Sequence, residues 1–133
     1  MKKFFLFAIL PLAAAVAMGC ASVPKSIPED LSSSELVQRA QEATDAYNYD
    51  AAIAYYQAAI DRFGGDPAIM CMGEYEIAFI YYKQGKYAQS AELFEKLLAR
   101  YAAPGGDSLP ARYQILAEKV LPKVKAGIAA EKQ

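Results

Sequence analysis

The sequence predicts an all-α protein in which antiparallel helix pairs stack into an array, with two pairs and one closing helix. Apolar residues recur at helical spacing through most of the chain after residue 32. A stretch at 47–60 also overlays a second stretch at 85–98, so that Tyr49 falls on Tyr87. We call this separation of 38 residues the repeat offset. Small and aromatic residues occupy the same places in both copies, which favours helices that pack closely on their neighbours.

The first residues are typical of a secretory signal peptide. Lys2 and Lys3 precede an uncharged run, 4–17, which Pro11 interrupts. This run is shorter than the roughly 20 residues that a membrane-spanning helix needs. We therefore expect residues 1–19 to be a signal peptide.

The end of this segment, Ala17-Met18-Gly19-Cys20, resembles a bacterial lipobox, in which the cysteine becomes a lipid-modified N-terminus after cleavage. The resemblance implies lipidation of Cys20. Because no Asp follows the cysteine, it also implies a place at the outer membrane facing the periplasm, with the inner membrane or the cell surface left open. An ordinary signal peptide cut near Ala21, or an uncleaved anchor, is the alternative.

The rest of the chain divides into a flexible tether, residues 20–31, and a helical domain, residues 32–130. The tether is rich in Pro, Ser and charge and has no periodicity. Cap and turn residues predict five helices in the domain: from Ser32 to about Ala46, Tyr49 to Phe63, Pro67 to Gln84, Lys86 to about Ala102, and from Pro110 onward.

Local signals place the ends of these helices. Ser32 followed by Glu35 is a capping-box pattern, and Asn48 is a favourable N-cap. Asp66 and Pro67 are expected as the cap and first residue of the third helix. The glycine pair 64–65 is expected to stop the second helix in a left-handed conformation.

The fifth helix is predicted to repeat the pattern of the third. Tyr113 and Ile115 lie one repeat offset after Tyr75 and Ile77. We expect a kink or break at Pro122, because proline removes a backbone hydrogen bond. Beyond it the chain is mostly polar or small and is expected to lack a packing face, so the helix would close the array.

The spacing of small and aromatic residues around the two turns resembles the tetratricopeptide repeat (TPR) over roughly residues 32–125, with Tyr47 at the place of the usual turn glycine. The resemblance implies that the first helix of each unit lines a concave groove for a protein or peptide. Carried onto this sequence, the groove-facing positions would be Val37, Gln41, Met72, Tyr75, Phe79, Tyr82, Lys83 and Tyr113. The alternative for the aromatic members is that they are core between units.

Composition argues against several other functions. The chain has no histidine and no glycine-rich phosphate loop, so we expect no catalytic residues, no cofactor and no metal site. A net charge of −1 without a Lys/Arg run argues against nucleic acid as a partner. The acidic pairs, Asp45 with Asp50 and Glu74 with Glu76, are expected to be solvated surface charges, and Cys71 to be a buried thiol.

The leading interpretation is a lipid-anchored TPR scaffold that binds proteins in the bacterial cell envelope. The chain is similar to the periplasmic TPR lipoprotein family of the outer-membrane β-barrel assembly machinery. An accessory lipoprotein of a periplasmic solute-binding or transport system is the alternative. A ring-shaped oligomer would favour the second function and a monomer the first, and the sequence leaves the oligomeric state open.

Overall fold

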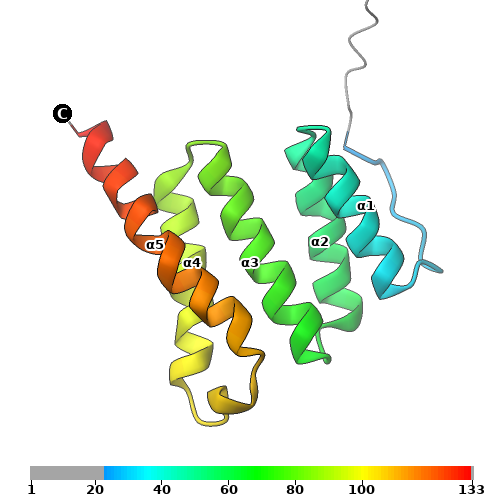
Figure 1. Ribbon diagram of the computed structural model, residues 1–133. Helices are drawn as coiled ribbons and strands as arrows, with labels where there is room; N and C mark the ends of the chain where they lie inside the picture. The colour runs from blue at the N-terminus through cyan, green and yellow to red at the C-terminus, as the bar shows by residue number, and fades with distance from the viewer. Residues whose placement is uncertain (1–22, 133) are drawn as a thin grey trace, which may run out of the picture.

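The computed structural model describes residues 23–132, which form helices and connecting segments without strands. The elements are α1 (Ser33–Asp45), α2 (Tyr49–Phe63), α3 (Pro67–Lys83), α4 (Tyr87–Ala102), the short 3-10 helix η1 (Gly106–Ser108) and α5 (Ala111–Glu131). Each α-helix packs on the next along the chain, and α3 also touches α5 (Figure 1). The prediction of an all-α fold with paired neighbouring helices is confirmed. The expected signal peptide and Cys20 lie outside the described residues.

Three predicted helix starts are confirmed by their hydrogen bonds. The Ser32 hydroxyl accepts from the Glu35 N–H at 3.3 Å, while the Ser32 N–H donates to the Glu35 carboxylate at 2.9 Å, which completes the capping box of α1. The side chains of Asn48 and Asp66 cap α2 and α3, with Pro67 at the first position of α3. These ends are fixed by residues within one helical turn.

The turns between α1 and α2 and between α3 and α4 have the same construction. Tyr47 and Gly85, which are one repeat offset apart, both have a left-handed backbone, with φ of 57° and 72°. The N–H of the following residue, Asn48 or Lys86, donates to the carbonyl five residues earlier, at 2.8 Å and 2.9 Å. The offset seen in the sequence therefore corresponds to a repeated turn.

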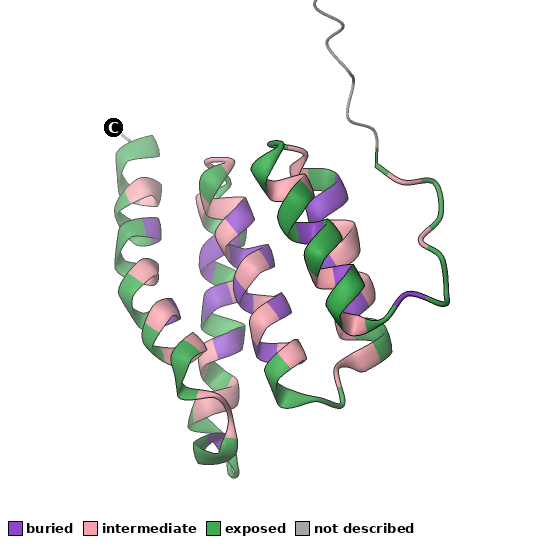
Figure 2. Ribbon diagram, turned by 45° about the vertical axis from the view of Figure 1, so that its right-hand side comes forward, coloured by how far each residue is buried: buried purple, intermediate pink, exposed green. Residues whose placement is uncertain are grey.

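Burial repeats with the same offset. Figure 2 shows the buried residues of α3 along the sides that face its neighbours. Ser90, on α4, donates its hydroxyl to the carbonyl of Ala78 on α3 at 2.8 Å, so small side chains let these two backbones approach. The buried pairs separated by the repeat offset are Ala40 and Ala78, Ala52 and Ser90, Tyr56 and Phe94, and Ala59 and Leu97.

The predicted left-handed stop of α2 is wrong. Gly64 keeps a right-handed backbone with φ of −66°. The chain instead turns directly into α3, with the Asp66 N–H donating to the Phe63 carbonyl at 2.9 Å. Glycine is required at position 64 for space, because a Cβ there would collide with the carbonyl oxygen of Ile60.

Helix α5 does not repeat α3 in the expected register. Ile77 is buried, whereas Ile115, its counterpart by the repeat offset, is 62% exposed. The repeat offset pairs the buried Ala78 of α3 with position 116 of α5. The buried alanine of α5 is instead Ala117, one position later. The segment that contains η1 precedes α5 and has no counterpart before α3, so it adjusts the register of the last helix.

The expected break at Pro122 is also absent, and the helix packs beyond it. Helix α5 runs through Pro122 to Glu131. Glu118, whose carbonyl loses its helical partner, is exposed, so water can satisfy that carbonyl. Past the proline, Val124 is fully buried, and Ile128 packs on the same core cluster. Two apolar residues are sufficient here because they meet a cluster formed by α3 and α4.

The last part of the predicted tether lies against the helices. The Arg62 guanidinium on α2 donates to the carbonyls of Pro28 and Ile27 at 2.6 Å and 3.0 Å. Leu31 is buried with Leu36 of α1, and Ile27 packs on the same cluster. The packed part of the chain therefore begins near Ile27, before the expected boundary at residue 32.

Candidate interaction surface

Three predicted groove residues form a ladder of rings along α3. Tyr75 and Phe79 are stacked, with ring centroids 5.9 Å apart and an interplanar angle of 12°. Tyr82 continues the ladder, its centroid 5.8 Å from that of Phe79. The positions follow i, i+4 and i+7, so helical geometry aligns the rings on one side of α3.

Neighbouring helices cover this ladder unequally. The Tyr75 ring contacts Phe94 of α4 at 5.7 Å and Tyr113 of α5 at 6.0 Å, and only 7% of Tyr75 is exposed. Phe79, Tyr82 and Tyr113 are half-buried. Both alternatives for the aromatic residues therefore apply: Tyr75 belongs to the core, and the other three present part of their rings to solvent. We call Phe79, Tyr82 and Tyr113 the aromatic surface.

Charged groups surround the aromatic surface. The Lys83 ammonium lies 5.2 Å from the centre of the Phe79 ring, and the Arg112 guanidinium lies 5.9 Å from the centre of the Tyr113 ring. Burial raises the pKa of the Glu76 carboxyl, and the positive charges of Lys83 and Arg112 oppose this rise. The surface thus combines rings with one carboxylate and two cations.

Sequence reasoning missed Glu76 and Arg112 as members of this group. One available signal was that Glu76 lies seven residues before Lys83, on the same side of a helix. Arg112 could not be found in this way, because its proximity depends on how α5 packs against α3. The expectation that Glu76 is an ordinary solvated charge is wrong, since the residue is half-buried and this burial raises its pKa.

The remaining predicted groove residues are not joined to the aromatic surface by the contacts of residues 23–132. Val37 packs into the cluster around Ala40 and Tyr56. Gln41 is exposed on α1, and Met72 is half-buried near the start of α3. The structure therefore unites the other α3 members and the α5 member of the predicted groove, and leaves Met72 and the α1 members apart.

Glu74 has a structural role that the sequence did not predict. The Arg100 guanidinium on α4 donates twice to the Glu74 carboxylate, at 2.7 Å each, and the Glu74 side chain is only 14% exposed. Two parallel hydrogen bonds of this kind hold both partners in one geometry. Glu74 ties α3 to α4 and is not a freely solvated charge.

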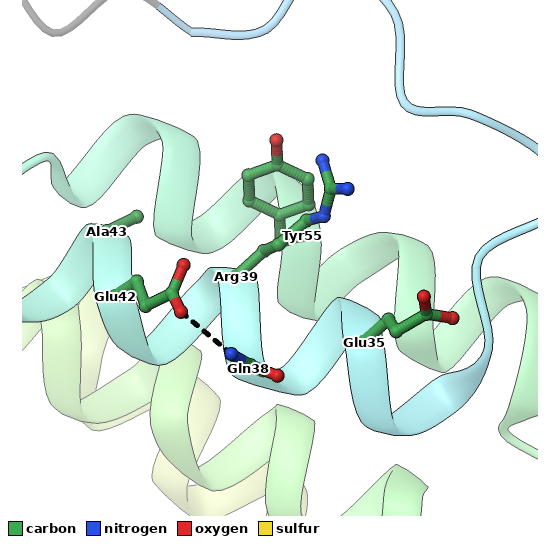
Figure 3. A pocket seen from close by; sticks show the side chains of 6 residues that line it. All are labelled: Glu35, Gln38, Arg39, Glu42, Ala43 and Tyr55. Carbon is green, nitrogen blue, oxygen red and sulfur yellow. Dashed lines mark hydrogen bonds between the residues drawn. The ribbon is translucent and has the colours of Figure 1, made fainter.

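A separate hollow lies away from the aromatic surface, on α1 and α2. It measures about 480 Å³, and its lining residues are Glu35, Gln38, Arg39, Glu42, Ala43 and Tyr55. Figure 3 shows that Gln38 donates to Glu42 along α1, at 2.9 Å. Glu35 belongs to the capping box, whose hydrogen bonds from Ser32 lower the Glu35 pKa. Both carboxylates of this hollow are thus engaged in bonds that stabilise α1.

Residues 23–132 contain neither a metal-binding cluster nor a membrane-spanning helix. No group of three or more Cys, Asp or Glu side chains is placed to hold a metal ion in this range. None of the helices formed by these residues combines the length and apolarity needed to cross a bilayer. Cys71 is fully buried, as expected.

The chain has a relative among known proteins. The chain is 34% identical over 114 residues to an uncharacterized protein of Treponema pallidum (strain Nichols). The match covers 84% of this chain and 46% of the relative, so the chain spans less than half the length of that protein. No model of a known protein family matches the chain, and no solved structure matches it.

Proposed function

We propose that this chain is a TPR-type scaffold lipoprotein of the bacterial cell envelope that binds a protein or peptide partner through the aromatic surface. The observation that carries the proposal is the partial exposure of Phe79, Tyr82 and Tyr113 on a helix array. Aromatic residues and arginine are enriched where proteins bind one another. The repeated turns and buried pairs support the TPR assignment of the array.

The lipid anchor in this proposal rests on the signal-like start of the chain and on Cys20. Detergent phase partitioning of the wild type and Cys20→Ala tests it. We expect the wild type in the detergent-rich phase and the variant in the aqueous phase or unprocessed, because acyl chains supply the membrane affinity. Equal partitioning of both proteins into detergent would remove the lipid from the proposal.

The binding surface is tested separately by site-specific photo-crosslinking in cells that produce the full chain. A photoreactive residue replaces Phe79 or Tyr82, which are half-buried and therefore more tolerant of change than Tyr75. The matched control replaces Ile115, which is apolar and exposed on α5. We expect one discrete crosslinked protein from positions 79 and 82 and none from 115.

A second variant connects the crosslink to the chemistry of the surface. Lys83→Glu reverses one of the two cations beside the rings. We expect it to weaken the crosslinks at 79 and 82 while the melting temperature changes little, since Lys83 is exposed. The same products from all three positions would contradict the surface assignment. Because of the resemblance noted above, outer-membrane protein assembly is the first process in which to seek the partner.

A further inference from the structure

The two repeated turns share a backbone but differ in their side chains, and two of the differences go against local preferences. Tyr47 occupies the left-handed position of the first turn, where the second turn has Gly85. A left-handed backbone is unfavourable for a residue with a Cβ, and glycine avoids that penalty. Tyr47 is also 78% exposed, so burial within this chain does not explain its presence. Its ring meets that of Tyr49 edge to face, with centroids 6.2 Å apart.

The second difference is the charge at the end of the preceding helix. Asp45 is the last residue of α1, whereas Lys83, its counterpart by the repeat offset, is the last residue of α3. The C-terminal end of a helix carries partial negative charge and favours a cation. The last turn of α1 has no basic residue, so the charge of Asp45 adds to that of the helix end. Two local preferences are thus broken close together in the chain, which is expected at functional sites.

These residues line one hollow of about 410 Å³, formed by Thr44, Asp45, Tyr47, Tyr49 and Lys83. The Thr44 hydroxyl donates back into α1, to the Ala40 carbonyl at 2.8 Å. The Lys83 ammonium lies over the Phe79 ring, and no ion pair joins it to Asp45. Within residues 23–132, Asp45 therefore lines the hollow without a counter-ion.

We propose that this hollow receives a lysine or arginine side chain of a protein partner. The cation would lie against the Tyr47 and Tyr49 rings, pair with Asp45 and face the negative end of α1. The Lys83 ammonium also lines the hollow, but it lies over the Phe79 ring, so Asp45 and the end of α1 supply the negative charge that an incoming cation would meet. An uncharged group would leave Asp45 unpaired. The site adjoins the aromatic surface at Lys83, but the proposal depends on Asp45 and the Tyr47 and Tyr49 rings and not on the assignment of that surface.

A matched pair of small probes tests the proposal on the full chain in detergent micelles. N-acetyl-arginine amide carries the guanidinium, and N-acetyl-citrulline amide has nearly the same shape without the charge. Each is titrated while ¹H–¹⁵N spectra are recorded. We expect the arginine probe to move the amide signals of residues 44–49 in a saturable way, and the citrulline probe to bind about three- to tenfold more weakly.

Three variants separate the site from general electrostatics. Asp45→Asn and Tyr47→Gly should each weaken binding of the arginine probe about three- to tenfold. Tyr47→Gly should keep the fold, because Gly85 makes the same turn. Asp50→Asn removes a nearby exposed carboxylate outside the hollow and should leave binding unchanged. Equal binding of both probes, no shift at residues 44–49, or an equal effect of Asp50→Asn and Asp45→Asn would overturn the proposal.

Discussion

Replacing Gly127 with alanine tests how the end of α5 is held on the array. A Cβ at Gly127 would lie 2.7 Å from Cγ and Cδ1 of the Tyr87 ring and 2.8 Å from Cδ2. Carbon atoms in contact normally stay about 3.5–4.0 Å apart, so helix or ring must move by about 1 Å. The ring also packs against Tyr82, with centroids 5.9 Å apart. We therefore expect α5 to move away from α4.

Two opposing effects decide the magnitude. Alanine is favoured over glycine in a helix interior by about 1 kcal/mol. Overpacking of a filled contact costs about 1–3 kcal/mol, and displacement of α5 also loosens the packing of Val124 and Ile128. We expect Gly127→Ala to lower the free energy of unfolding by about 1 kcal/mol, whereas helix propensity alone would raise it by a similar amount. The sign of the change therefore identifies the contact.

Urea unfolding followed by circular dichroism measures this change. Ala126→Gly, at an exposed neighbouring position, calibrates the propensity effect and should lower stability by about 1 kcal/mol. In a Tyr87→Ala background the collision is gone, so Gly127→Ala should become neutral or stabilising. If Gly127→Ala stabilises the wild type as much as it stabilises Tyr87→Ala, the close contact between α5 and α4 is not present.

Three further changes probe buried polar groups. Burial raises the Glu76 pKa above 4.5, so the folded protein favours the protonated, uncharged carboxyl. The stability that this group contributes is therefore complete at low pH and is lost as the pH rises through the raised pKa. Glu76→Gln should thus raise the melting temperature at about pH 7 and change it little at about pH 4, and an equal effect at both pH values would contradict the pKa shift. Ser90→Ala removes the hydroxyl that donates to Ala78 and should lower the free energy of unfolding by about 1 kcal/mol in urea titrations, whereas no loss would question the bond. Glu74→Gln and Arg100→Gln should show a coupling of about 0.5–1 kcal/mol in a double-mutant cycle, and additive effects would show that the pair contributes nothing.

The helix starts could be predicted because their causes are local. Ser32, Asn48 and Asp66 each cap a helix through a hydrogen bond to a residue two or three positions away. Such bonds depend on residue type and spacing, which the sequence displays directly. The left-handed turn at Gly85 also has a local cause, the residue type at the turn itself. The comparable stop proposed for Gly64 failed because a close approach to Ile60, and not a special φ, requires glycine there.

The candidate surface could be predicted only in part. The ring ladder of α3 follows from helical spacing, so Phe79 and Tyr82 were found together. Which rings remain exposed depends on where α4 and α5 lie, and the sequence could not separate the buried Tyr75 from its neighbours. The position of Arg112 beside Tyr113, and hence beside the α3 ladder, likewise depends on the register of α5.

By itself, the sequence determined the helical fold, the internal repeat and the boundaries set by capping residues. These follow from periodicity and from interactions within one turn of helix. The tertiary structure decided whether α5 survives Pro122, where Ile27 and Leu31 lie, and which carboxylates are withdrawn from solvent. Those outcomes depend on contacts between residues distant in the chain, and burial against such neighbours outweighs local preference.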